Sequence, residues 1–316
     1  MFLGMMNWMR AETIETTIRR LAHFGFECLE IAGDPEQYDA KEVRRLLDEN
    51  GVQCWGAATL MTPGRDLIHS DPKVRESTIK FVKSLLTLAK DLDGRILTIV
   101  PSQVGKVTPM ASPEDEWRWA VESLKEIYAY SEKVGITLAL EPLNRFETNF
   151  INRADQALCL AQAVGPNCGI ALDAFHLNIE EADLYKTVSM AGKKLVDFHV
   201  ADNNRWAAGQ GHYDWPKLIK ALDAGGYKYA LTVEFVAPVD RTPRDPYPGS
   251  QAISNPDLTP EQLKFIQDHG SGLLTEEFYS GLVAQSAKTL RKAMKRAGVV
   301  ETRMPKQAKV TTENVL

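Results

Sequence analysis

The stretch ITLALEPLNRFETNFINRADQALCLAQAVGPNCGIALD, residues 136–173, decides the fold that the sequence predicts. It contains two short apolar runs, Ile136–Glu141 and Gly169–Asp173, on either side of the amphipathic segment Arg153–Val164. Apolar residues recur every three or four positions in that segment, which is typical of a helix packed on one face. The stretch therefore predicts a strand–helix–strand unit, and each of its two strands ends on an acidic residue.

The same alternation continues along the whole chain. The other predicted strands are Phe2–Asn7, Phe26–Ala32, Val52–Leu60, Arg95–Pro101, Leu195–Val200 and Tyr229–Phe235. The other predicted helices include Thr13–Phe24, Lys41–Asn50, Asp71–Leu92, Pro113–Lys133 and a last one at Leu273–Ala297. Gly25, Gly51 and Gly135 stand where predicted helices end, as expected of helix C-termini. Eight strands alternating with helices predict an α/β protein with a single (β/α)8 TIM barrel.

An open doubly wound sheet is the structural alternative. It would normally carry a glycine-rich phosphate turn after an early strand, and the sequence has neither a GxGxxG motif nor a P-loop. We expect one barrel over residues 1–300, with a long insertion loop at 237–272 between strand 8 and the last helix. That loop is rich in Pro and Asp, and a loop of this length is usually functional or disordered. The polar segment 301–316 is expected to be a flexible tail.

Composition excludes several classes of protein. The chain has 316 residues, 44% of them hydrophobic, and a formal net charge of −5, which argues against a nucleic-acid binder with a basic face. No apolar run approaches the length of a membrane span. The first residues lack the features of a signal peptide, so a cytoplasmic location is expected. None of the four cysteines forms a CxxC pair, which disfavours a disulfide or zinc framework.

Four candidate metal ligands end consecutive predicted strands. They are Glu141, Asp173, His199 and Glu234. A single acid at a strand end is often only a helix cap, and a single buried histidine is often core, but the carboxyl ends of barrel strands converge on one mouth. Three carboxylates gathered there would repel one another unless a cation compensated them. The pattern therefore predicts a bound metal.

The ligand types indicate which metal. Three carboxylates and one imidazole form a mostly hard set, which favours Mn²⁺, Co²⁺ or Mg²⁺ over a structural zinc, and the imidazole favours Mn²⁺ or Co²⁺ over Mg²⁺. We expect Mn²⁺, with Co²⁺ or Mg²⁺ as alternatives. We expect one divalent ion per chain. Four protein ligands leave coordination positions for two substrate oxygens, which is an open, catalytic arrangement.

The segments around these residues resemble a known family. They are LEPLNRFETNF (140–150), LDAFHLNIEE (172–181), FHVADNNRWAAGQGHYDW (198–215) and TVEF (232–235). Together they resemble the xylose-isomerase-like sugar isomerase/epimerase superfamily, and they look most similar to ketose 3-epimerases of the D-tagatose and D-psicose type. The resemblance implies that the four strand-end residues are the metal ligands.

The resemblance also implies further roles. Glu141 and Glu234 match the acid/base pair on opposite faces of the substrate carbon, and Glu147, His176 and Arg205 match residues that hold the substrate. From its own place after the first strand, Trp8 is expected to form an apolar wall for the sugar. Removing a proton next to a carbonyl creates an enediolate, whose charge a metal stabilises, and a second carboxylate that returns the proton inverts the carbon.

Other functions remain open at the level of sequence. Some members of the superfamily resemble catalytic subunits of C-glycoside deglycosidases, which act on 3-keto glycosides with a small partner subunit, and the long 237–272 loop keeps that alternative. A non-catalytic barrel that binds a sugar or a partner protein is the second alternative. We expect a sugar or sugar derivative as ligand, no nucleic acid, no membrane, and a homo-oligomer with or without a second small subunit.

Overall fold

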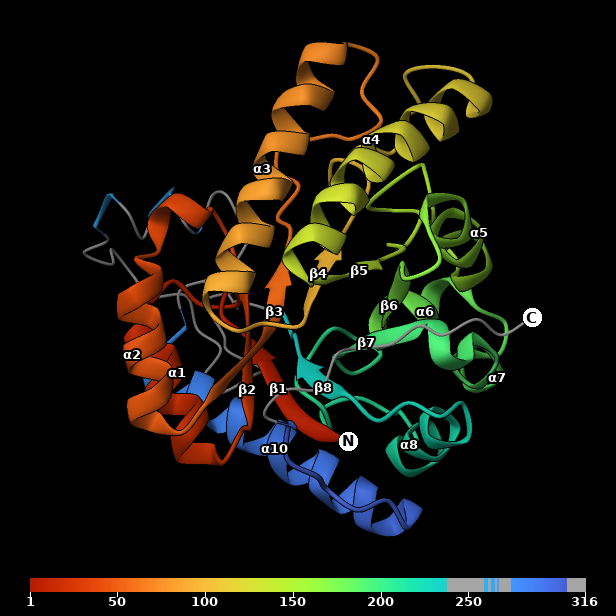
Figure 1. Ribbon diagram of the computed structural model, residues 1–316. Helices are drawn as coiled ribbons and strands as arrows, with labels where there is room; N and C mark the ends of the chain where they lie inside the picture. The colour runs from red at the N-terminus through yellow and green to blue at the C-terminus, as the bar shows by residue number, and fades with distance from the viewer. Residues whose placement is uncertain (238–258, 261–262, 265, 267–273, 306–316) are drawn as a thin grey trace, which may run out of the picture.

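Eight parallel strands close into a barrel, and their order around the ring is their order along the chain (Figure 1). The computed structural model describes residues 1–237, 259–260, 263–264, 266 and 274–305. The strands are β1 Phe2–Met6, β2 Cys28–Ala32, β3 Gln53–Ala58, β4 Ile96–Ile99, β5 Thr137–Leu140, β6 Gly169–Asp173, β7 Leu195–Val200 and β8 Ala230–Val233. Pairing of β1 with β8, from Phe2↔Ala230 to Met5↔Val233, closes the ring. The predicted TIM barrel is confirmed.

Helices surround the strands (Figure 1). They are α1 Ile14–Phe24, α2 Ala40–Asn50, α3 Pro72–Asp91, α4 Pro113–Val134, α5 Ala154–Val164, α6 Ala174–Glu180, α7 Leu184–Ala191, α8 Trp215–Ala224 and α10 Glu276–Ala297. Two short helices, α6 and α7, lie between β6 and β7. The predicted start of the last helix, Leu273, lies outside the described residues, and α10 is capped by the side chain of Thr275.

Local sequence explains where the helices begin and end. The side chains of Thr13, Asp39, Asp71 and Ser112 each accept a hydrogen bond from a backbone N–H in the first turn of the helix that follows. Helices α1, α2 and α4 end at Gly25, Gly51 and Gly135, whose φ angles of 71°, 66° and 77° lie in the left-handed region that favours glycine. The predicted helix ends are confirmed at these three glycines.

Residues 301–305 return to the N-terminal end of the barrel. The N–H of Thr302 donates to the carbonyl of Met1 at 2.8 Å, and Met304 packs against a buried cluster that includes Phe2, Trp55 and Ala230. The rest of the predicted tail, and most of the predicted 237–272 loop, lie outside the described residues. The predicted flexibility of the tail therefore stays a prediction for residues 306–316.

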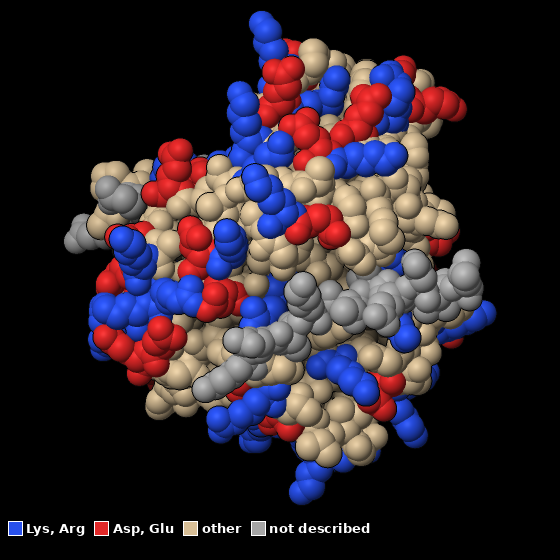
Figure 2. Space-filling model, in the orientation of Figure 1, with Lys and Arg blue, Asp and Glu red and all other residues tan. Residues whose placement is uncertain are grey.

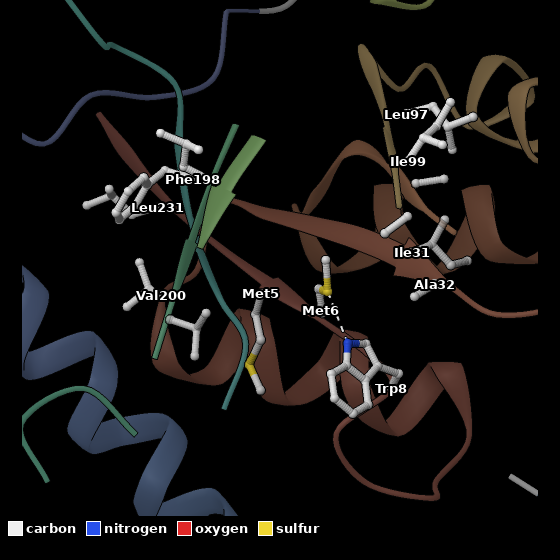
Figure 3. Close-up of a cluster of buried hydrophobic side chains, with 14 of the residues drawn as sticks. Met5, Met6, Trp8, Ile31, Ala32, Leu97, Ile99, Phe198, Val200 and Leu231 are labelled. Carbon is white, nitrogen blue, oxygen red and sulfur yellow. Dashed lines mark hydrogen bonds between the residues drawn. The ribbon is translucent and has the colours of Figure 1, made fainter. Parts of the chain in front are cut away.

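Buried apolar side chains form a large cluster in the barrel. Figure 3 shows Met6 and Trp8 near Ile31 and Ala32, with the Trp8 indole N–H directed at the sulfur of Met6. On the face in Figure 2, basic and acidic side chains are interspersed. All four cysteines are free, as predicted. Within the described residues, no helix is both long and apolar enough to cross a membrane.

Close packing between β3 and β4 generates a test of the fold. A Cβ added at Gly56 would lie 2.3 Å from the backbone oxygen of Ile96, whereas a Cβ at Gly281, exposed on α10, meets nothing within 4 Å. We expect Gly56→Ala to destabilise the protein by about 1–3 kcal/mol, because backbone must move. Gly281→Ala, the matched control, should stabilise it by about 0.5–1 kcal/mol through helix propensity. Urea unfolding measures both, and a neutral Gly56→Ala would contradict this packing.

Candidate active site

A cavity of about 480 Å³ opens at the carboxyl ends of the strands. Its wall is mainly apolar and its polar residues are few, as in most sites for small molecules. The polar or charged residues that line it are Thr59, Thr62, Glu141, Glu147, His176, Arg205 and Glu234, and the apolar ones include Trp8, Leu60, Val100, Leu143, Phe175 and Val236.

The four predicted ligands converge beside this cavity. One ligand atom from each of Glu141, Asp173, His199 and Glu234 lies within 4.8 Å of the others. His199 Nδ1 is 3.0 Å from Glu141 Oε1 and 3.3 Å from Glu234 Oε2. Such spacings suit adjacent ligands of one ion bound at about 2.0–2.2 Å. All four residues are at least 93% buried, so the donor set fits a divalent ion that compensates the carboxylates.

The two glutamates lie in different electrostatic surroundings. Burial raises the pKa of Glu141 to about 7, although the nearby His199 works against this. Burial would also raise the pKa of Glu234, but Arg205 and then His199 outweigh it and lower that pKa to about 2. Glu234 Oε1 also accepts a hydrogen bond from Trp8 Nε1 at 2.8 Å. Trp8 therefore lines the cavity and also donates to a carboxylate.

Arg205 brings positive charge to the carboxylates. Its guanidinium forms ion pairs with Asp173 and, at 3.4 Å, with Glu234, and it lies 4.9 Å from the centre of the Phe175 ring. The residue has φ of 64°, a conformation that is uncommon outside glycine. Its carbonyl accepts from the N–H of Val236 at 2.8 Å, which fixes the loop after β7 against the residues after β8.

His176 is held as a neutral imidazole beside the cavity. Burial lowers its pKa to about 3. The backbone N–H of Asn144 lies 3.3 Å from Nδ1 and its side-chain Nδ2 lies 2.8 Å from the same atom. Because both groups are donors, Nδ1 is an acceptor and the proton sits on Nε2. Asn144 also donates to Glu147 Oε1 at 2.8 Å, so one amide side chain contacts two of the predicted substrate-binding residues, His176 and Glu147.

A second group of buried acids lies behind His199. Nε2 of the imidazole is 2.8 Å from Asp197 Oδ2 and 3.4 Å from Glu30 Oε2. Burial, followed by the charge of Asp197, raises the pKa of Glu30 to about 8. The predictions from sequence missed Glu30, Asp197 and Asn144. A signal existed for Asp197, because it lies two residues before His199 in one strand and so faces the same side.

The structure brings together every residue predicted for the site. All four predicted ligands, and the predicted substrate-binding residues Glu147, His176, Arg205 and Trp8, lie at or beside this one cavity. A closed barrel of this kind, with three carboxylates and an imidazole gathered beside a cavity, could hold a divalent ion next to a small molecule.

The chain belongs to the xylose isomerase-like TIM barrel family, whose sequence profile matches residues 18–269. It is 29% identical over 224 residues to an L-ribulose 3-epimerase of Mesorhizobium japonicum, covering 70% of this chain and 75% of that protein. It is 29% identical over 233 residues to a D-psicose 3-epimerase of Ruminiclostridium cellulolyticum, covering 69% and 76%. A crystal structure of D-psicose 3-epimerase with D-tagatose from Clostridium cellulolyticum H10 shares the fold, with a TM-score of 0.76, 24% identity, and coverage of 93% and 99%.

The buried state of His176 predicts a pH dependence. The folded protein keeps the imidazole neutral down to about pH 3, whereas the unfolded chain protonates it near pH 6.5. Between those values the unfolded state binds one more proton, so this residue makes the folded state lose up to about 1.4 kcal/mol per pH unit as pH falls. The unfolding free energy of the native protein in urea minus that of His176→Gln should therefore fall by this slope between about pH 6 and pH 4, because the variant has no imidazole at this position. A difference that does not change with pH would contradict the buried neutral state.

Proposed function

We propose that the protein is a divalent-metal-dependent ketose 3-epimerase, which removes and returns a proton at the carbon next to a carbonyl. The observation that carries the proposal is the buried cluster of three carboxylates and one imidazole beside a cavity. The names of the relatives, L-ribulose 3-epimerase and D-psicose 3-epimerase, support the same reaction. These relatives do not favour the C-glycoside deglycosidase alternative, and nothing in the site favours a non-catalytic barrel.

Glu141, Asp173, His199 and Glu234 would hold the ion, and the imidazole among the oxygen donors favours Mn²⁺ or Co²⁺ over Mg²⁺. When bound, the ion supplies Lewis-acid stabilisation of the negative charge that develops on the substrate's oxygens. The protein's own contribution is to fix the donors before substrate arrives. Glu234 is held by Trp8 and Arg205, and Asp173 by Arg205 and by the N–H of Phe175 at 2.6 Å.

The proton is moved by two carboxylates. Glu141 follows β5 and Glu234 follows β8, and both line the cavity. In the proposed reaction one of them accepts the proton on one side of the substrate carbon and the other returns a proton from the opposite side, which inverts the carbon. A substrate that can react in either direction requires each glutamate to serve in both roles.

The remaining residues bind the sugar. His176 presents its Nε2–H as a neutral donor for a hydroxyl or carbonyl oxygen. Arg205 is a second donor, and Glu147 accepts from hydroxyls. Trp8 provides an apolar face for the CH groups of the sugar. A cytoplasmic location, and a homo-oligomer with or without a second small subunit, remain predictions.

Metal removal tests the centre of this proposal. We expect the purified protein to bind about one divalent ion per chain, because the cluster offers one shared set of donors. Chelation should abolish epimerisation of D-psicose or D-tagatose, and Mn²⁺ or Co²⁺ should restore it best. Inductively coupled plasma mass spectrometry and activity after back-titration measure this. Full activity in protein freed of metal would refute the proposal.

Substitution of each glutamate tests the proton transfer. Glu234→Gln and Glu141→Gln should each lower kcat by about 10²–10⁴-fold, because an amide cannot take up the proton, although it can still coordinate an ion. Glu116→Gln is the matched control: Glu116 is 3% exposed on α4 and accepts from the N–H of Met110, outside the cavity. Deuterium incorporation from D₂O into ketose measures the step. Native exchange rates in either variant would remove that residue from the mechanism.

A further inference from the structure

The edge of the His199 ring that carries Nε2 points away from the cavity. It lies next to two carboxylates for which the proposed reaction has no role. Nε2 lies 2.8 Å from Asp197 Oδ2 and 3.4 Å from Glu30 Oε2, and all three residues are fully buried. Nδ1, on the other edge, faces Glu141 and Glu234. The imidazole is thus placed between a pair of carboxylates at the cavity and another pair deeper in the barrel.

Asp197 is fixed from three other strands. Trp55 of β3 donates its indole N–H to Oδ1 at 3.0 Å, Thr98 of β4 donates its hydroxyl to Oδ2 at 3.2 Å, and Thr232 of β8 donates to Oδ1 at 3.4 Å. Hydrogen bonds to a buried carboxylate stabilise its charged form. A carboxylate tied in this way has one position in the barrel, and His199 must pack against it.

We propose that Asp197 is a positioning residue, which orients the His199 ring so that Nε2 keeps its proton and Nδ1 presents its lone pair toward Glu141 and Glu234. An imidazole can bind a metal only through an unprotonated nitrogen, and the partner of the other nitrogen selects the tautomer. Of the two carboxylate oxygens near Nε2, Asp197 Oδ2 at 2.8 Å is closer than Glu30 Oε2 at 3.4 Å. The angle at Nε2 does not meet that of a hydrogen bond to any described residue, so the contact with Asp197 is one of charge and packing. This inference rests on the metal site proposed above.

A second metal ion is the competing explanation for the same residues. Ligand atoms of Glu30, Asp197 and His199 also lie within 4.8 Å of one another, and both oxygens of Glu30 lack a hydrogen-bond partner among the described residues. The three hydrogen-bond donors on Asp197 favour the positioning role, because they already stabilise its charge without an ion. The number of ions bound per chain separates the two explanations.

The test is Mn²⁺ affinity, measured by isothermal titration calorimetry on dialysed protein without substrate. Asp197→Asn keeps the shape of the side chain and removes its charge. We expect it to raise the Mn²⁺ dissociation constant by about 10–100-fold, the usual effect of losing such a partner of a metal-bound histidine. Asp66→Asn is the matched control: Asp66 is fully buried and pairs with Lys106 at 2.7 Å, so it should alter stability but not Mn²⁺ affinity.

A milder variant covers the case in which Asp197→Asn does not fold. Thr98→Val removes one hydroxyl that holds Asp197 and keeps a similar volume. It should raise the Mn²⁺ dissociation constant on the order of threefold to tenfold, the range that one hydrogen bond provides. Thermal unfolding followed by circular dichroism separates a loss of affinity from a loss of stability.

The outcomes are distinguishable. Native protein that binds no Mn²⁺ would refute the proposed function itself. Native binding together with an unchanged dissociation constant in both Asp197→Asn and Thr98→Val would overturn only the positioning role, even if both variants were less stable. Two ions per native chain, with one lost in Asp197→Asn, would also overturn it, because Asp197 would then be a ligand. Weaker binding of a single ion by Asp197→Asn or Thr98→Val, together with an unchanged Mn²⁺ dissociation constant in Asp66→Asn, supports the positioning role.

Discussion

Compensation of buried negative charge is the constraint on which the site depends. Among the described residues, five buried carboxylates gather around the imidazole of His199, those of Glu30, Glu141, Asp173, Asp197 and Glu234. Isolated charges are too costly to bury without partners, so each carboxylate needs a donor, a cation or a proton. Arg205 supplies a cation for two of them, and the hydroxyls and indole around Asp197 supply donors for another. The negative charge left over is what makes the cavity end of this cluster attractive to a divalent ion.

The two-residue period of a strand sets these groups in layers. In β7, Asp197 and His199 face the barrel interior two residues apart, and Thr232 and Glu234 do the same along and just after β8. The residues nearer the N-terminal ends form the deeper layer and those nearer the carboxyl ends form the mouth. Because all eight strands run in the same direction, the order of residues along each strand becomes their order of depth in the barrel.

Sequence alone predicted most of the fold and the mouth of the site, because strand ends are readable from apolar runs and converge in any barrel. It missed what depends on side chains from distant strands. Glu30 reads as an ordinary residue of the run CLEIA, and only barrel closure brings its carboxylate to His199. Asn144 lies in a loop without periodicity, so no pattern indicates that its amide would reach His176. The second role of Trp8, as donor to Glu234, likewise depends on a contact between residues that follow the first and the last strand.

That contact links formation of the site to completion of the fold. Trp8 and Glu234 are 226 positions apart in the chain, and they meet because β1 pairs with β8. Contacts between such distant segments carry a large loop-closure cost until the intervening units have packed. The contact of Glu141 spans a shorter stretch of chain: its Oε1 lies 3.0 Å from Nδ1 of His199, which is 58 positions further along. One of the contacts that hold Glu234 therefore forms only when the barrel closes, whereas its contacts with His199 and Arg205 come from β7 and the loop that follows it. An incompletely closed chain would still gather some of the acids, but Glu234 would lack the indole donor that Trp8 provides.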